Sequence, residues 1–250
     1  MSNIRTYLGD CLEVMDKLIL EGVVVDAIIT DLPYGTTQNK WDCIIPFDEM
    51  WARINKIKKE NAPVILFAQT PFDKVLGASN INSLKYEWIW EKSQPTGFLN
   101  AKKMPLKYHE NILVFYDKLP TYNPILREKP LTNIRPKHSG KTFKNNGNYG
   151  DFKHGDFREI GIEESYPSNI IKFDNPQNGY HPTEKPIRLI EYLIRTYTNE
   201  NDLVLDFTMG SGTTVVASKA LNRGAIGIEK ECGYFDIANK RLEQVQGALF

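Results

Sequence analysis

The stretch Val25–Tyr34 (VDAIITDLPY) decides how the rest of the chain is interpreted. Its apolar, branched first half is typical of a buried strand, and Pro33 and Gly35 end that strand and turn the chain outward. The tetrapeptide Asp31–Tyr34 is therefore expected at the carboxyl end of a strand. In an open α/β sheet, ligands bind along that edge, so the tetrapeptide is a candidate functional site.

The tetrapeptide offers two hydrogen-bond acceptors and a flat ring. Asp31 supplies a carboxylate and Leu32 a main-chain carbonyl, while Pro33 restricts the turn because its φ is fixed and it has no N–H. Tyr34 adds a ring that can stack on a planar group. This set suits a planar ligand with an amine, such as the exocyclic amine of a nucleobase. The structural alternative is a strand-end Asp, a Pro turn and a core Tyr, and four residues do not separate the two.

A second candidate site lies nearer the C-terminus. The predicted strand Leu203–Asp206 runs into a turn with Gly210 and Gly212 that opens a helix, and Glu229 ends the next predicted strand, 23 residues after Asp206. This is the general layout of a nucleoside-cofactor site, in which glycines let the backbone approach the ligand and the acid accepts hydrogen bonds from ribose hydroxyls.

Two residues favour one class of cofactor. Val215 stands where a nicotinamide-binding fingerprint has a third Gly or Ala. Asp206 would repel a pyrophosphate at the turn, whereas it suits an ammonium group, as in the methionine part of S-adenosylmethionine.

Together these motifs resemble those of the amino-methylating DNA methyltransferases. That family has Asp, Asn or Ser, then Pro-Pro, then an aromatic residue; here Leu32 replaces the first Pro, and its backbone supplies the same carbonyl. The family's cofactor motif is Phe-x-Gly-x-Gly, and here Thr208 replaces the Phe, with Phe207 one position earlier. Because Asp31 precedes the Gly turn, the chain is similar to the circularly permuted, β-class group, of the adenine-N6 type found among site-specific and phage DNA modification methylases.

The resemblance implies a fold and a domain organisation. The fold is α/β: a Rossmann-like methyltransferase with a circularly permuted mixed sheet and helices on both faces, in which the strand before Asp10 lies beside the strand ending at Glu229. It assigns residues 1–116 and 166–250 to the catalytic and cofactor-binding core, and residues 117–165 to a target-recognition insert. The matched segments include Trp90–Lys92 and His109–Asn111.

The resemblance also implies roles for individual residues. The catalytic residues are Asp31, Leu32, Pro33 and Tyr34, and the cofactor is S-adenosylmethionine. Asp10 is expected near the cofactor adenine and His181–Pro186 near its methionine end. The full set of expected cofactor-binding residues is Asp10, Cys11, His181, Thr183, Lys185, Asp206, Thr208, Gly210, Gly212, Thr213 and Glu229.

Charge points to DNA as a partner. The formal net charge is zero, but Lys92–Arg158 contains 13 Lys and Arg residues against 5 Asp and Glu, so a basic block lies inside an acidic frame. Such a block is the electrostatic footprint expected for phosphates, although a solvated charged loop is the plain alternative. The expected DNA-binding residues are Lys102, Lys103, Lys137, Lys141 and Lys144.

Length and composition argue against a membrane-spanning, a secreted or a metal-binding protein. A chain of 250 residues can bury one substantial core, and no apolar run approaches the roughly 18 residues of a membrane span. The N-terminus does not start a signal peptide, and Cys11, Cys43 and Cys232 are scattered as free thiols are, so the expected location is cytoplasmic and no metal site is indicated.

Hydrophobic periodicity predicts the remaining elements. Strands are expected at Ile4–Leu8, Ala62–Ala68, Tyr86–Trp90, Asn111–Tyr116 and Gly224–Glu229. Helices are expected around Leu12–Ile19, at Pro46–Lys59, Pro71–Ala78 and Pro186–Thr196, after the Gly turn through Leu221, and from Tyr234. Residues 122–156 show no periodicity, which is typical of a long functional loop.

Several functions stay open on these observations. The leading hypothesis is a DNA methyltransferase acting on the N6 amine of adenine, because Asp31 favours adenine where the N4-cytosine enzymes more often have Ser. The alternatives are N4-cytosine methylation, a non-catalytic DNA-binding relative, and, further off, an RNA or protein amine as target. A homodimer and a cognate endonuclease of a restriction-modification system are further partners to test.

Overall fold

The computed structural model describes residues 3–35, 42–128, 164–176, 179–180 and 183–245. The chain divides into two compact units, residues 1–123 with 169–250, and residues 124–168. In the described part of the second unit, strand β6 (Arg127–Glu128) pairs antiparallel with strand β7 (Glu164–Ser165). The target-recognition role predicted for residues 117–165 stays a prediction, and most of that stretch lies outside the described residues.

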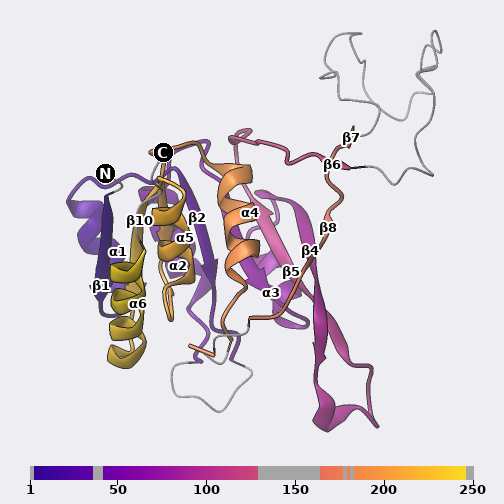
Figure 1. Cartoon of the computed structure of the whole chain (residues 1–250). Helices are drawn as coiled ribbons and strands as arrows, with labels where there is room; N and C mark the ends of the chain where they lie inside the picture. Colours follow the sequence, from indigo (N-terminus) through magenta and orange to yellow (C-terminus); the bar gives the residue numbers. More distant parts are fainter. Residues whose placement is uncertain (1–2, 36–41, 129–163, 177–178, 181–182, 246–250) are drawn as a thin grey trace, which may run out of the picture. The chain divides into compact units, whose positions relative to one another are not determined.

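The first unit is built on a mixed sheet with eight described strands (Figure 1). Their spatial order is β1, β10, β9, β2, β3, β5, β4, β8. The strands from β1 to β3 in this order are parallel, β5 is antiparallel to both of its neighbours, and β8 is parallel to β4. The bounds are β1 (Ile4–Leu8), β2 (Ala27–Asp31), β3 (Val64–Ala68), β4 (Leu84–Thr96), β5 (Lys107–Phe115), β8 (Ile170–Phe173), β9 (Leu203–Asp206) and β10 (Gly224–Glu229).

Helices cover both faces of this sheet (Figure 1). One face packs against α1 (Cys11–Leu20), α2 (Phe47–Ile57) and α3 (Phe72–Ser79), and the other against α4 (Ile187–Tyr197), α5 (Thr213–Ala220) and α6 (Cys232–Gln244). Successive side chains of a strand point to opposite faces of the sheet. Ile28 therefore packs against the first set of helices and Ile29 against the second. Because both faces are covered, inner parallel strands such as β3 are continuous apolar runs, whereas the edge strand β1 contains Arg5 and Thr6.

The order of strands places the two sequence motifs side by side. Strand β2 is hydrogen-bonded to β9, with Ile28 opposite Leu205. The chain leaves β2 for α2 on one face and leaves β9 for α5 on the other, so the two connections diverge. A crevice forms at the carboxyl ends where such connections separate, and Asp31 and Asp206 end these two strands.

The fold class is confirmed, and so is the placement of the first strand. Leu8 of β1 lies opposite Glu229 of β10 in a parallel pair, as the circular permutation requires. The structure extends the two predicted strands at Tyr86–Trp90 and Asn111–Tyr116 into the longer pair β4 and β5. Strand β8 was not predicted, because a run as short as Ile170–Phe173 becomes a strand only through pairing with the edge of β4. Among the described residues, no helix is long and apolar enough to cross a membrane.

Candidate active site

A cavity of about 350 Å³ opens at the carboxyl ends of β1, β2, β9 and β10. Six acidic residues line it. Four of them lie at or just beyond the ends of these strands: Asp10, Asp31, Asp206 and Glu229; the other two are Glu184 and Glu231. The turn after β9 supplies further lining from Thr208 to Ser211. Carboxylates in this number suit hydroxyl and ammonium groups of a ligand and disfavour phosphate.

Glu229 is tied to the glycine turn through main-chain donors. One carboxylate oxygen accepts a hydrogen bond from Gly210 N at 2.8 Å, and the other accepts one from Glu231 N at 2.7 Å. Gly210 has a φ of 51°, a left-handed conformation that glycine adopts without a Cβ clash. Burial raises the pKa of Glu229. Each oxygen retains a lone pair, so the carboxylate can still accept from a ligand hydroxyl.

Asp206 is the most deeply placed acid of the cavity, with 4% of its surface exposed. Its Oδ1 accepts hydrogen bonds from the Thr30 hydroxyl at 2.6 Å and from Thr208 N at 3.2 Å. Burial raises the pKa of Asp206 to about 6. A cationic ligand group would offset the cost of ionising this carboxylate, whereas an anion would add to it.

Asp10 caps helix α1 and also lines the first cavity. Its Oδ1 accepts a hydrogen bond from Leu12 N at 3.0 Å and so caps α1, while its Oδ2 lies 3.6 Å from Lys230 Nζ. Cys11 follows in the same lining, and burial raises its pKa to about 12, which keeps the thiol neutral at pH 7. The contact of Asp10 with the cofactor adenine stays a prediction.

A second cavity, of about 580 Å³, adjoins the first at the Asp31 motif. Asp31, Leu32, Pro33 and Lys185 line both cavities. The second cavity adds Tyr34, which follows β2, and residues from β4, β5 and the segment after β8: Trp90, Lys92, Glu110 and Asn175. Asp31 therefore lies where a ligand in one cavity would meet a ligand in the other.

Tyr34 belongs to the second cavity. Its hydroxyl donates a 2.7 Å hydrogen bond to Oδ1 of Asp31, and its ring lies 5.0 Å from that of Phe72, with a tilt of 33° between the planes. Burial raises the pKa of Tyr34 well above its usual value, so the phenol remains a donor. The ring is held from behind by Phe72, which suits the predicted stacking against a base.

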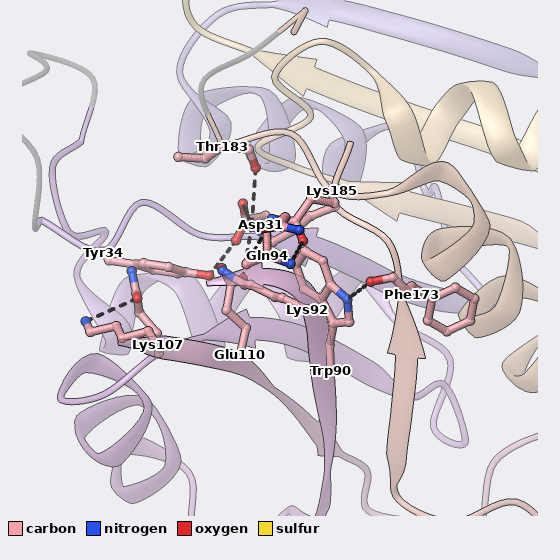
Figure 2. Close-up of polar contacts among 12 residues, drawn as sticks. Asp31, Tyr34, Trp90, Lys92, Gln94, Lys107, Glu110, Phe173, Thr183 and Lys185 are labelled. Atoms are coloured by element: carbon pink, nitrogen blue, oxygen red, sulfur yellow. Dashed lines mark hydrogen bonds and ion pairs between the residues drawn. The ribbon is translucent and has the colours of Figure 1, made fainter. Parts of the chain in front are cut away.

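Four charged side chains gather beside Tyr34 (Figure 2). Lys185 contacts the carboxylate of Asp31 and lies 3.5 Å from Oε2 of Glu110, while Lys92 Nζ lies 2.5 Å from Oε1 of Glu110. Only 7% of each lysine side chain is exposed. Burial raises the pKa of Asp31, whereas Lys185 and Lys92 hold that of Glu110 below its ordinary value despite burial.

Comparison with known proteins identifies the family. A family model described as DNA methylase, of the N6 and N4 type, matches residues 25–240. The chain belongs to this DNA methylase family. S-adenosylmethionine, the cofactor expected from the sequence, is the methyl donor of the family.

Some relatives are similar over nearly the whole chain and others over a part of it. The type II methyltransferase M1.MboII of Moraxella bovis is 29% identical over 97% of both chains, and M2.DpnII of Streptococcus pneumoniae is 52% identical over 33% of this chain and 31% of its own. The solved complex of M1.HpyAVI with S-adenosylmethionine superposes with a TM-score of 0.65 at 28% identity, covering 96% of this chain and 100% of the other. The cytosine-N4-specific PvuII methyltransferase superposes with a TM-score of 0.66 at 17% identity, covering 100% of this chain and 89% of its own. At this identity the likeness shows the fold alone.

The methylase places most of the predicted cofactor-binding residues around the first cavity. His181 lies outside the described residues, and the roles of the others stay predictions. The donor set fits S-adenosylmethionine, since Glu229 and Asp206 end the neighbouring strands β10 and β9 and line one cavity, and carboxylates suit the hydroxyl and ammonium groups of that cofactor. The predicted cofactor-binding residues that line the first cavity are Asp10, Cys11, Thr183, Lys185, Asp206, Thr208, Gly210, Thr213 and Glu229.

Gly212 is not among the residues that line the cavity, and its contact with the cofactor stays a prediction. It has a φ of 81°, and a Cβ there would lie 2.7 Å from Cβ of Ala238 on α6. The second glycine of the motif is therefore required for the turn into α5 and for the approach of α6. Its part in the site is to shape the backbone.

Thr208, which replaces the Phe of the family motif, joins the two motifs of the methylase. Its hydroxyl donates a 2.9 Å hydrogen bond to the main-chain carbonyl of Asp31. Phe207 is 1% exposed and packs in the core with Ile226 and Ile228, and it also lines the first cavity. Where the family motif has the ring of a Phe, Thr208 instead makes a hydrogen bond that links the end of β9 to the end of β2.

The segment that carries Lys185 is fastened to the glycine turn by Arg241 of α6. Arg241 Nη2 lies 3.1 Å from Oε1 of Glu184, and its Nη1 donates to the carbonyl of Ser211 at 2.8 Å. The hydroxyl of Thr213 donates to the same Glu184 oxygen at 3.3 Å. One guanidinium thus fixes two stretches of the cavity lining to each other.

The predicted DNA-binding lysines divide into two groups. Lys102 and Lys103 are exposed on the turn that joins β4 to β5, beside a short 3-10 helix (Phe98–Asn100). Lys137, Lys141 and Lys144 lie outside the described residues. Contact of either group with DNA stays a prediction.

Sequence analysis did not assign Trp90, Lys92 and Glu110 to the site, although it matched their segments to the family. On β4 and β5 these residues lie close together because Trp90 pairs with Glu110 in the antiparallel register. The sequence did contain a signal for Glu110. Glu110 shares a strand face with Ile112 and Val114, and an acid on the buried face of a strand is rare unless it is paired.

Proposed function

We propose that this methylase transfers a methyl group from S-adenosylmethionine to the N6 amine of adenine in DNA, at specific sites. One observation carries the proposal: Asp31 and the carbonyl-bearing Leu32 line both cavities, at the point where they adjoin. The acid-lined first cavity would hold the cofactor. The second cavity, with the rings of Tyr34 and Trp90 and a lining rich in charged side chains, would hold the target base.

The chain's own groups prepare the amine. Adenine N6 is a weak nucleophile because its lone pair is delocalised into the ring. The carboxylate of Asp31 and the carbonyl of Leu32 accept its two N–H bonds, which favours a pyramidal nitrogen with its lone pair directed at the first cavity. Alignment and fixed dipoles of this kind are the main contributions to such a transfer, and no covalent enzyme intermediate is needed.

S-adenosylmethionine supplies an electrophilic methyl group on a sulfonium centre, and the bond electrons stay with sulfur as the methyl leaves. The amine nitrogen forms the new bond and releases one proton. Asp31 is the acceptor at that point, since burial raises its pKa and so its affinity for a proton. Glu229 holds the ribose hydroxyls and Asp206 the ammonium of the cofactor.

The target base must leave the duplex to reach a cavity of this kind. Tyr34, supported by Phe72, would stack on the base and hold it out of the helix. The basic block that includes Lys102 and Lys103 would contact phosphates, and residues 117–165 would select the sequence. Phosphate contacts position the chain without specifying sequence.

N4-cytosine methylation is the second candidate, because the family contains both specificities. Asp31 supports adenine, since Ser is more frequent at this position in cytosine enzymes. A non-catalytic DNA-binding relative is opposed by the intact acceptors at Asp31 and Leu32 and by the intact turn at Gly210 with Glu229.

The deciding experiment supplies isotope-labelled S-adenosylmethionine and unmethylated genomic DNA of mixed sequence, then digests the DNA to nucleosides. N6-methyldeoxyadenosine is the expected labelled product. N4-methyldeoxycytidine would establish the second candidate. Binding of cofactor and DNA without any labelled nucleoside would establish the non-catalytic relative.

A further inference from the structure

Each oxygen of the Asp31 carboxylate already has a partner in the structure. Its Oδ1 accepts from the Tyr34 hydroxyl at 2.7 Å, and its Oδ2 is in contact with the Lys185 ammonium. The target amine needs this carboxylate as its acceptor. Each oxygen keeps a lone pair, but the Lys185 ammonium stands at Oδ2, so an arriving amine would have to share that oxygen with a cation (Figure 2).

A second acceptor for the Lys185 ammonium lies close by. Glu110 Oε2 is 3.5 Å from Lys185 Nζ, is buried, and receives no hydrogen bond from the described residues. The other oxygen of Glu110 is satisfied by Lys92 at 2.5 Å. A buried carboxylate oxygen without a donor is unfavourable, so Glu110 offers an unfilled position to the ammonium.

Charge allows the ammonium to move between the two acids. Asp31 and Glu110 carry two negative charges, and Lys92 and Lys185 carry two positive ones, so the buried cluster stays neutral whichever acid holds Lys185. Burial lowers the pKa of Lys185, but the two carboxylates raise it by more, and the group remains an ammonium. The ring of Phe67, 5.3 Å from Nζ, adds a contact that does not depend on either acid.

Withdrawal of the ammonium would also help the transfer itself. Lys185 lines the first cavity as well as the second. An ammonium kept on Asp31 would stand near the cationic sulfonium and would repel it, whereas a neutral amine in that place would not.

We propose that Glu110 is a positioning residue of the methyl-transfer step: it receives the Lys185 ammonium when the target amine takes that ammonium's place at Asp31. The inference rests on the proposed function, since it requires an amine substrate. Without a base, Lys185 keeps the Asp31 carboxylate in position. With a base, Glu110 keeps Lys185 away from Asp31.

The test begins with Glu110→Gln, which keeps the shape of the side chain and removes its charge. Rates are measured with tritium-labelled S-adenosylmethionine at saturation and unmethylated bacterial genomic DNA. We expect kcat to fall at least about tenfold, because the ammonium stays on Asp31, while the cofactor Kd remains within about twofold of the parent value. Thermal unfolding of each variant checks that it is folded.

Two double variants separate the proposal from a role in charge balance. Glu110→Gln/Lys185→Met removes the competing ammonium, and we expect its kcat to rise above that of Glu110→Gln. Glu110→Gln/Lys92→Met removes the same amount of charge from the same cluster but leaves Lys185 on Asp31, so its kcat should stay low.

Equal recovery in both double variants would overturn the proposal, because charge balance alone would explain it. Absence of recovery in either would overturn it as well. If Glu110→Gln does not fold, Glu110→Asp, which draws the carboxylate back by one methylene, replaces it in all three variants with the same expectations. Lack of methylation by the parent chain is a separate result, which would remove the proposed function and this inference together.

Discussion

The hydroxyl of Thr30 donates a 2.6 Å hydrogen bond to Oδ1 of Asp206, across the boundary between β2 and β9. The two residues are 176 positions apart in the chain. The bond holds the strand of the proposed catalytic motif to the strand of the proposed cofactor turn, directly beside Asp31. The methylase therefore sets the relative position of its two motifs by a buried polar contact as well as by sheet pairing.

Asp31→Asn should abolish most methyl transfer while leaving cofactor binding nearly unchanged. The amide keeps the size of the side chain but replaces one acceptor with a donor, so the amine loses its charged partner. We expect kcat to fall by at least about a hundredfold. Calorimetric titration with S-adenosylmethionine is the control, and an equal loss of affinity would place Asp31 in the cofactor site instead.

Glu229→Gln should weaken cofactor binding with little effect on kcat at saturating cofactor. The carboxylate is held by Gly210 N and Glu231 N, and ribose hydroxyls would donate to its remaining lone pairs. Loss of hydrogen bonds to a charged acceptor should raise the cofactor Kd by about 10-fold to 100-fold. An unchanged Kd in an equilibrium titration would refute the assignment.

Asp206→Asn should stabilise the free chain at pH 7 and leave its stability unchanged near pH 4. Burial raises the pKa of Asp206 from 3.8 to about 6, so the folded chain keeps a proton that the unfolded chain releases. The parent therefore loses stability as pH rises between about 4 and 6, by roughly 3 kcal/mol, and the Asn variant lacks this loss. Urea unfolding of both chains at several pH values measures the difference.

The same substitution gives a second, independent readout. If Asp206 meets the ammonium of the cofactor, Asp206→Asn should weaken cofactor binding at pH 7. The affinity of the parent should also increase from pH 5 to pH 7 as the carboxylate ionises. A cofactor Kd that is equal in both chains and flat with pH would contradict the role of Asp206, whatever the unfolding data show.

Arg241→Lys should weaken cofactor binding although it conserves charge. The fork of Arg241 reaches Glu184 and the Ser211 carbonyl together, which a single ammonium cannot do in the same geometry. Loosening these two stretches should raise the cofactor Kd several-fold. Lys240→Ala, on the exposed part of the same helix, is the matched control and should leave the Kd unchanged.

The basic block should be visible in the salt dependence of DNA binding. Replacing Lys102 and Lys103 with Ala should weaken binding and lower the slope of log affinity against log salt by about 0.9 for each phosphate that the variant no longer neutralises. The triple replacement of Lys137, Lys141 and Lys144 is expected to act in the same way. In each case cofactor affinity should not change.

The control for these lysines is the pair Lys17→Ala and Lys56→Ala, two exposed positions on α1 and α2. This pair removes the same charge away from the block and should leave the salt slope at the parent value. If Lys102 and Lys103 behave like the control pair, they lie on a solvated surface, and the phosphate-binding residues belong elsewhere in the chain.

Local pattern was enough to predict the elements that frame the site. The branched run before Asp31, the glycine turn after Asp206 and the acid at Glu229 are each consecutive features, and each ends a strand as expected. Parallel strands bring their carboxyl ends to one edge, which predicts a shared crevice; the permuted fold was predicted from the order of the motifs together with the resemblance to the methyltransferase family.

The partners of individual side chains depended on tertiary structure. Lys185 could be predicted to lie near the cofactor, but its contact with Asp31 joins residues 154 positions apart. Glu110 and Lys92 enter the cavity only because β4 and β5 pair in one particular register, and Gly212 is required by Ala238 on a helix that follows it. Periodicity reports which face of an element is buried. Which buried charges meet is decided by sheet order and register, and these are set by packing between distant segments.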